Sequence, residues 1–124
     1  MKRVTGVGGI FFKARDPKAL YEWYRKHLGI ESAEGSGAMF RDDPDNPGVT
    51  VWSIFPQDTK YLGAGSQSFM INFRVDDLAA LLKSLREEGV AVDEKVEDHE
   101  YGKFGWITDP EGNRVELWEP PKAQ

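Results

Sequence analysis

Alternation of apolar and polar residues near the carboxyl end of the chain predicts a β-hairpin. Residues 104–119 read FGWITDPEGNRVELWE, and residues 109–113 supply the proline, glycine and asparagine of a tight turn. After the turn, Val115 and Leu117 point to the same face of their strand, because successive side chains alternate. That apolar face most simply packs on a core.

The opposite face of this hairpin carries a carboxylate among aromatic rings. A symmetrical pairing about the turn places Trp106 across from Glu116, while Arg114 and Trp118 flank Glu116 along its own strand. A strand of this kind could line a cavity. The same face could also be a solvated outer surface.

Two amphipathic helices are predicted, each with start and stop signals. Asp16, followed by proline, is expected to be the N-cap of the first helix, which ends before Gly29. Asp76 or Asp77 is expected to cap the second helix, which ends before Gly89. Their apolar faces are predicted to be Leu20, Trp23, Tyr24 and Leu28 in the first helix, and Leu78, Leu81, Leu82 and Leu85 in the second.

Runs of β-branched and aromatic residues predict the remaining strands. The expected strands are 7–14, a short strand near 38–40, 49–55, 69–75 and 90–96. The residues between them are rich in glycine, proline, asparagine and acidic side chains, which favour loops. The expected loops are 42–48, a linker at 56–67, and 97–103.

The two halves of the chain repeat this pattern. The same interval separates Asp16 from Asp76 and Gly29 from Gly89, and Gly48 and Gly112 both lie in turns before a last strand. Each half reads as a βαβββ module, roughly 5–57 and 67–120. Because so small a module buries little apolar surface alone, the two are expected to share one core in a single domain, 1–124.

Composition narrows the classes of function. The chain has 124 residues and a net charge of −5, whereas nucleic-acid binding favours a basic stripe. It has no cysteine, and no apolar run is long enough to cross a membrane. We therefore expect a soluble cytoplasmic protein that binds neither nucleic acid nor membrane.

Two segments carry a resemblance to a known family. FKARDPKALYEWYRKHLGIE at 12–31 and WITDPEGNRVELWEP at 106–120, together with the paired βαβββ halves, resemble the glyoxalase / bleomycin-resistance / dioxygenase group, also called the vicinal oxygen chelate superfamily. The resemblance implies an α+β fold in which tandem modules form curled mixed sheets around a cavity. Members include metal-dependent lyases and isomerases, dioxygenases and metal-free drug-binding proteins, so it does not select one reaction.

The resemblance also implies four metal-ligand positions, on the first and last strand of each module. These positions are Gly9, Trp52, Met70 and Glu116, and only Glu116 keeps a usual ligand type. One carboxylate cannot hold a catalytic metal alone, so no metal or other cofactor is predicted, and a divalent metal would require substitute ligands such as His99 or Asn72. Neither histidine falls at these positions: His27 is expected at the surface, and His99 in a loop.

If the family positions hold, strand alternation gives the residues that line the cavity. They are Gly9, Phe11, Lys13, Trp52, Met70, Asn72, Arg74, Trp106, Arg114, Glu116 and Trp118. Apolar walls with a few polar groups are typical of small-molecule sites. The alternative is that the large rings fill the space as ordinary core.

Two functions remain open from the sequence. The first is a protein, expected to be a homodimer, that binds a small organic and partly anionic molecule without a complete metal site. The second is a lyase or isomerase of the glyoxalase I type, or a related dioxygenase, with Glu116 as base or metal ligand. Pairing of Glu116 with Arg74, Arg114 or Lys13 would instead make it structural.

Overall fold

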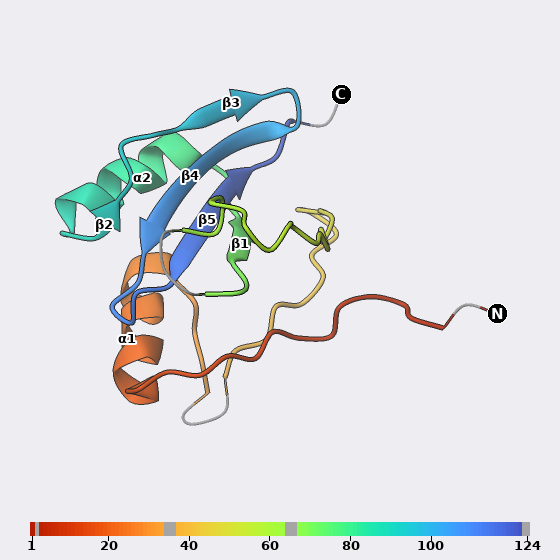
Figure 1. Cartoon of the computed structure of the whole chain (residues 1–124), viewed down its shortest axis with the longest axis horizontal. Helices are drawn as coiled ribbons and strands as arrows, with labels where there is room; N and C mark the ends of the chain where they lie inside the picture. Colours follow the sequence, from red (N-terminus) through yellow and green to blue (C-terminus); the bar gives the residue numbers. More distant parts are fainter. Residues whose placement is uncertain (2, 34–36, 64–66, 123–124) are drawn as a thin grey trace.

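The fold is a mixed α+β structure with one curled, unclosed sheet (Figure 1). The computed structural model describes residues 1, 3–33, 37–63 and 67–122. The sheet order is β1-β5-β4-β2, and β3 pairs with β4 beside this path. The elements are α1 (Pro17–Leu28), β1 (Ile71–Arg74), α2 (Leu78–Glu87), β2 (Ala91–Val92), β3 (Glu97–His99), β4 (Gly102–Thr108) and β5 (Arg114–Glu119).

Both helices begin and end at the signals that the sequence predicts. The carboxylate of Asp16 accepts a hydrogen bond of 3.1 Å from the amide of Ala19 at the start of α1. Gly29 ends α1 with φ of 69°, a conformation that a side chain disfavours. The alternative at α2 is settled in favour of Asp77, which accepts from the amide of Ala80.

The predicted hairpin forms with the predicted register. β4 and β5 are antiparallel, and Trp106 lies directly across from Glu116. β1 runs parallel to β5 on its other side, which places Asn72 beside Glu116. The turn between β4 and β5 is closed by Asp109, whose carboxylate accepts from the amides of Glu111 and Asn113 at 2.9 Å each. Three segments distant in sequence thus meet around one carboxylate.

One face of the sheet packs against both helices. Val115 and Leu117 lie on this face, as predicted, and each is at most 1% exposed. Burial of apolar surface contributes about 25 cal/mol per Å² to the free energy of folding. The packing of this face against the helices is therefore the main source of the protein's stability. The core cluster consists of Leu20, Tyr24, Leu78, Leu82, Leu85, Ile107, Val115 and Leu117.

The structure differs from the sequence predictions in the first module. Residues 7–14, 38–40 and 49–55 do not form strands, and 3–14 leave the body of the molecule as an arm (Figure 1). A strand exists only where a neighbouring backbone supplies ladder hydrogen bonds, and among the described residues no backbone pairs with these segments. Among the described residues, the first module therefore contributes α1, and the five strands lie in the second.

Smaller differences lie in the second module. The loop predicted at 97–103 is wrong in part, because Glu97–His99 is a strand that pairs with β4. The charged composition of residues 97–99 indicated a loop, but backbone pairing with β4 stabilises them as a strand. The strand predicted at 90–96 is shortened to two residues. Residues 64–66 of the predicted linker lie outside the described residues, as do residues 34–36. Among the described residues, no helix is long and apolar enough to cross a membrane.

Candidate functional site

The site is centred on Glu116, in the middle of β5. Its side chain points away from the helices, since Val115 and Leu117 on either side point toward them. Glu116 is nevertheless only 6% exposed, and Trp106 opposite it is 1% exposed. A buried carboxylate needs compensating polar partners, so its hydrogen bonds define what the site can do.

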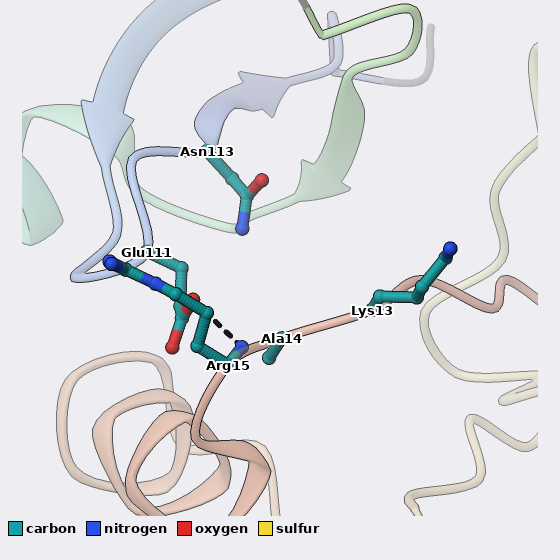
Figure 2. A pocket seen from close by; sticks show the side chains of 5 residues that line it. All are labelled: Lys13, Ala14, Arg15, Glu111 and Asn113. Carbon is teal, nitrogen blue, oxygen red and sulfur yellow. Dashed lines mark hydrogen bonds and ion pairs between the residues drawn. The ribbon is translucent and has the colours of Figure 1, made fainter.

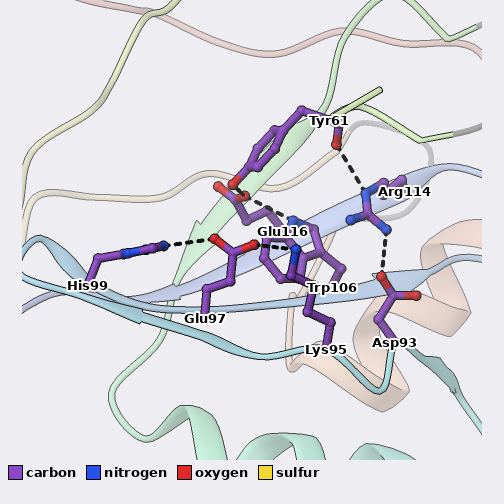
Figure 3. A network of polar contacts seen from close by, with 8 residues as sticks. All are labelled: Tyr61, Asp93, Lys95, Glu97, His99, Trp106, Arg114 and Glu116. Atoms are coloured by element: carbon purple, nitrogen blue, oxygen red, sulfur yellow. Dashed lines mark hydrogen bonds and ion pairs between the residues drawn. The ribbon is translucent and has the colours of Figure 1, made fainter. Parts of the chain in front are cut away.

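Three donors bind the Glu116 carboxylate. The side-chain amide of Asn72 on β1 donates to Oε1 at 2.6 Å, and the indole N–H of Trp106 donates to Oε2 at 3.0 Å. The hydroxyl of Tyr61 also donates to Oε2 (Figure 3). All three partners present hydrogen to the carboxylate, so Glu116 acts as an acceptor at both oxygens.

Sequence reasoning missed Tyr61, because it lies in the stretch predicted to be a linker. Its ring stands edge-on to Trp106, with centroids 6.0 Å apart, and stacks on Phe55 at 5.5 Å. Burial and then the hydrogen bond to Glu116 raise the pKa of Tyr61 well above its ordinary value. No local pattern signals this role, since it depends on how residues 56–63 cross the open face of the sheet.

Arg114 holds the Tyr61 segment against the sheet (Figure 3). Its Nε donates to the backbone carbonyl of Tyr61 at 3.2 Å, and its Nη1 forms an ion pair of 2.8 Å with Asp93. The guanidinium carbon also lies 5.1 Å from the centre of the Trp106 ring, which allows a cation–π contact. Arg114 is thus committed to positioning Tyr61 and Trp106, and it does not pair with Glu116 as the structural alternative required.

An aromatic cluster continues the open face beyond Glu116. Phe104 and Trp118 stack with centroids 6.1 Å apart and an interplanar angle of 9°. His99 and Tyr101 stack next to them at 5.0 Å. Glu97 accepts a hydrogen bond from His99, which together with Lys95 lowers the pKa of that carboxyl. We call His99, Tyr101, Phe104 and Trp118 the aromatic cluster.

The structure brings together the predicted site residues of the second module and leaves those of the first module apart. Five predicted residues, Asn72, Trp106, Arg114, Glu116 and Trp118, meet on the open face, and Arg74 lies beside Trp118 in the same ladder. Met70, just before β1, is half-buried. By contrast, Phe11 is 96% exposed and Trp52 is 77% exposed. Lys13 and Gly9 are also exposed, on the arm.

Lys13 borders a different, shallow pocket where the arm passes the β4–β5 turn (Figure 2). There Glu111 accepts hydrogen bonds from the amides of Arg15 and Asp16, which lowers the pKa of its carboxyl. The pocket has a volume of about 340 Å³ and is lined by Lys13, Ala14, Arg15, Glu111 and Asn113. Glu111 ties the entry of α1 to the turn, so we read this contact as structural.

The residues at the four family positions do not fit a metal ion. Gly9, Trp52 and Met70 offer no hard donor, and the oxygens of Glu116 accept hydrogen from three N–H or O–H groups. In the described part of the chain, no three His, Asp or Glu side chains lie together in a way that could hold an ion. His27 is bound elsewhere: its Nδ1 lies 2.6 Å from Glu88, with only 8% of its side chain exposed, so the surface expectation is wrong.

Comparisons with known proteins identify the family of this α+β fold. Residues 7–117 match the family described as Glyoxalase/Bleomycin resistance protein/Dioxygenase superfamily. The chain therefore belongs to this superfamily, as its motifs indicate. A comparison with curated proteins found no match.

Solved structures with similar folds serve different functions. The structure of TnmS3, an antibiotic binding protein from Streptomyces sp. CB03234, has a TM-score of 0.63 at 19% identity and covers 98% of this chain and 100% of its own. A glyoxylase/bleomycin resistance protein/dioxygenase domain from Frankia sp. EAN1pec has a TM-score of 0.61 at 17% identity, covering 98% and 96%. The oxidase ChaP-H2 has a TM-score of 0.54 at 19% identity, covering 90% of each chain. At these identities the likeness extends to the fold alone.

Proposed function

We propose that the protein binds a small, partly aromatic organic molecule on the open face of its sheet, without a resident metal ion. One observation carries the proposal: Glu116 is a buried carboxylate with three of its acceptor positions filled. A carboxylate offers about four such positions. Two donors bind Oε2 and one binds Oε1, so one acceptor position remains on Oε1, next to the exposed Asn72.

The surroundings of that position suggest the chemistry of the ligand. A hydroxyl or N–H group would donate to Oε1 of Glu116. A planar ring would stack on Trp118 and Phe104, which are half-buried and parallel. An anionic group on the same molecule would meet Arg74, whose Nη1 also donates to the carbonyl of Val49. The ligand class is therefore a planar molecule with one hydrogen-bond donor, with or without an anion.

The hydrogen bonds of Glu116 favour binding over chemistry. A general base must reach the proton it removes, and Tyr61, Asn72 and Trp106 leave Glu116 only the one open position on Oε1 from which to do so. A metal ion would have to displace these donors and recruit hard ligands that the neighbouring positions do not supply. A glyoxalase-type reaction thus has less support in this chain than ligand capture has. The antibiotic binding activity of TnmS3 is a property of a protein with the same fold.

Calorimetric titration with naphthol, naphthoate and hydroxynaphthoate tests the proposal. We expect the hydroxylated probes to bind, and Glu116→Gln to weaken them about tenfold, which is the effect of one hydrogen bond to a charged group. Glu100→Gln is the matched control, since Glu100 lies in the exposed β3–β4 turn. Equal affinity in both variants, or no heat with any probe, would contradict the proposal. Affinity that requires added zinc or nickel would contradict its metal-free part.

A further inference from the structure

Glu116 is a buried carboxylate whose described hydrogen-bond partners are all uncharged. The residue is only 6% exposed, and its hydrogen bonds come from a phenol, a side-chain amide and an indole, those of Tyr61, Asn72 and Trp106. Glutamate is rarely buried to this extent unless a positive charge pairs with it. Within the described ranges, Glu116 forms no ion pair with a lysine, arginine or histidine. Its negative charge is therefore hydrogen-bonded but not neutralised.

Two arginines on the open face of the sheet bind other groups instead. Arg114, two residues before this carboxylate on β5, forms its ion pair of 2.8 Å with Asp93 (Figure 3). Arg74 on β1 donates to the carbonyl of Val49, which directs its guanidinium toward residues 48–49. Neither arginine thus supplies the positive charge that the burial of the carboxylate calls for.

The hydroxyl of Tyr61 shows the sign of the charge around this site. Burial first, and then the hydrogen bond and the charge of Glu116, raise the pKa of Tyr61, and the charge of Glu97 adds to the increase, while Arg114 acts in the opposite direction. Glu97 is itself paired with Lys95 at 3.0 Å. Because Arg114 and Lys95 each have a carboxylate of their own, Glu116 leaves this group of side chains with a net negative charge. A donor that enters here is therefore favoured if it is a cation.

The open acceptor position on Oε1 suits an ammonium group better than a metal ion. Oε2 accepts from Tyr61 and Trp106, whereas Oε1 accepts only from Asn72, which is exposed. A metal ion needs three or more protein ligands, and the residues that the structure describes contain no such group of histidine and acidic side chains. An ammonium group needs one carboxylate oxygen, and its other N–H groups can donate to water. Its hydrogen bond is charge-assisted on both sides, which makes it stronger than that of a hydroxyl.

Two half-buried rings lie next to this position on the same face. Trp118 follows Glu116 by two residues on β5, so its side chain starts roughly 7 Å further along the strand. Phe104 lies across from Trp118 in the β4–β5 ladder, and the planes of the two rings are within 9° of parallel. The faces of such rings attract cations as well as apolar carbon. A nitrogen separated from an aromatic ring by one or two carbons matches this spacing.

We propose that the ligand of the open-face site is an organic cation, an arylalkylamine whose protonated nitrogen donates to Oε1 of Glu116 and whose ring packs on Trp118 and Phe104. The buried carboxylate is then paired with a positive charge. This inference rests on the proposed function, which leaves the donor open between hydroxyl and N–H groups. An anionic group on the same molecule would still meet Arg74, so zwitterionic amines belong to the class.

Calorimetric titration with naphthylmethylamine and naphthylmethanol tests the inference, because the two probes share a ring and differ in a charged or neutral donor. At neutral pH the amine should bind at least about tenfold more tightly than the alcohol. Glu116→Gln should remove most of this preference, and the exposed control Glu100→Gln should retain it. Naphthylmethyl-trimethylammonium, which has no N–H group, should bind more weakly than the amine. An alcohol that binds as tightly as the amine, or a preference that survives Glu116→Gln, would overturn the inference.

Asp93→Asn gives a second test in which Glu116 itself is not substituted. This change removes the carboxylate that neutralises Arg114, so the guanidinium should repel the amine and lower its affinity by about two- to fivefold. The affinity for the alcohol should stay the same, because the alcohol is uncharged. Equal affinity of the amine for Asp93→Asn and the wild-type protein would contradict a site selected by charge.

The two proposals can fail separately in these titrations. Binding of the alcohol and of hydroxynaphthoate without any preference for the amine would keep the proposed function and remove the inference about the cation. Failure of every naphthyl probe, the amine included, to produce heat would remove both.

Discussion

The hydroxyl of Tyr24 on α1 donates a hydrogen bond of 2.8 Å to the carboxylate of Asp109, which follows β4. Tyr24 is 7% exposed and Asp109 is 4% exposed, so the bond is shielded from water. It joins the helix of the first module to the turn of the second. The Asp109 carboxylate also receives the turn amides, and both modules therefore depend on one buried acceptor.

Tyr24→Phe should lower the free energy of unfolding by about 1–3 kcal/mol, which is the usual effect of removing a hydrogen bond to a charged group. The ring and its packing remain in Tyr24→Phe, so the loss of stability measures the contribution of the hydroxyl alone. Urea denaturation followed by circular dichroism measures it. Tyr21→Phe on the exposed side of the same helix is the control and should change stability little. Equal effects of the two substitutions would show that the Asp109 contact does not stabilise the fold.

Glu116→Gln should also destabilise the protein by about 1–3 kcal/mol. The glutamine amide presents an N–H₂ group to at least one of the donors that Glu116 accepts, which leaves buried hydrogens unpaired. The emission of Trp106 should change, because its indole N–H loses a charged partner. Thermal unfolding and tryptophan fluorescence check both effects against Glu100→Gln. Unchanged stability in Glu116→Gln would indicate that water replaces the lost acceptor.

Gly102→Ala should be strongly destabilising, by at least about 2 kcal/mol. Gly102 has φ of 129°, and an added methyl group would lie 2.5 Å from the carbonyl oxygen of Glu119 and still closer to the indole nitrogen of Trp118. The variant should therefore disturb the aromatic cluster as well as β4. Gly6→Ala is the control, since nothing lies within 4 Å of its added group. Near-ultraviolet circular dichroism of the two variants would separate a local change from global unfolding.

Stability should fall at alkaline pH because of two tyrosines. Burial and a hydrogen bond to Asp109 raise the pKa of Tyr24, as burial and Glu116 raise that of Tyr61. A raised pKa in the folded state means that the unfolded chain loses these protons first. The stabilising contribution is thus complete below pH 10, the ordinary tyrosine value, and is lost progressively above it.

Denaturant midpoints measured from neutral pH to about pH 11 check this expectation. The double variant Tyr24→Phe/Tyr61→Phe should begin from a lower stability and show a flatter decline with pH. A decline of equal steepness in the variant would assign the alkaline loss to other groups. Tyr21→Phe again serves as control, because it removes a tyrosine from the exposed side of α1.

Local signals predicted the elements that are stabilised locally. The caps at Asp16 and Asp77 and the stop at Gly29 depend on neighbours within a turn, and the structure confirms them. The β4–β5 register followed from its tight turn, which is why the pairing of Trp106 with Glu116 was predictable. The residues of turns and helix caps therefore made the two helices and the β4–β5 hairpin predictable, and with them the position of Glu116 on the open face.

Interactions between distant segments were beyond the reach of sequence patterns. Tyr61 contacts Glu116 across a separation of 55 residues, and its surroundings read as linker. Glu97–His99 reads as a polar loop, and only the adjacent β4 makes it a strand. Segments 7–14 and 49–55 show the reverse case: their β-type composition predicts strands, but no described backbone pairs with them.

Trp106 and Trp52 are at opposite extremes of solvent access, 1% and 77% exposed. In the intrinsic emission, Trp106 should therefore contribute a blue component that is shielded from acrylamide, and Trp52 a red component that acrylamide quenches readily, while the half-buried Trp23 and Trp118 should lie between them. Without any added dye, the least and the most readily quenched emission thus report on the buried sheet at Trp106 and on the exposed segment at Trp52. Any event that encloses Trp52 should move the second component toward the first and leave the interior signal in place.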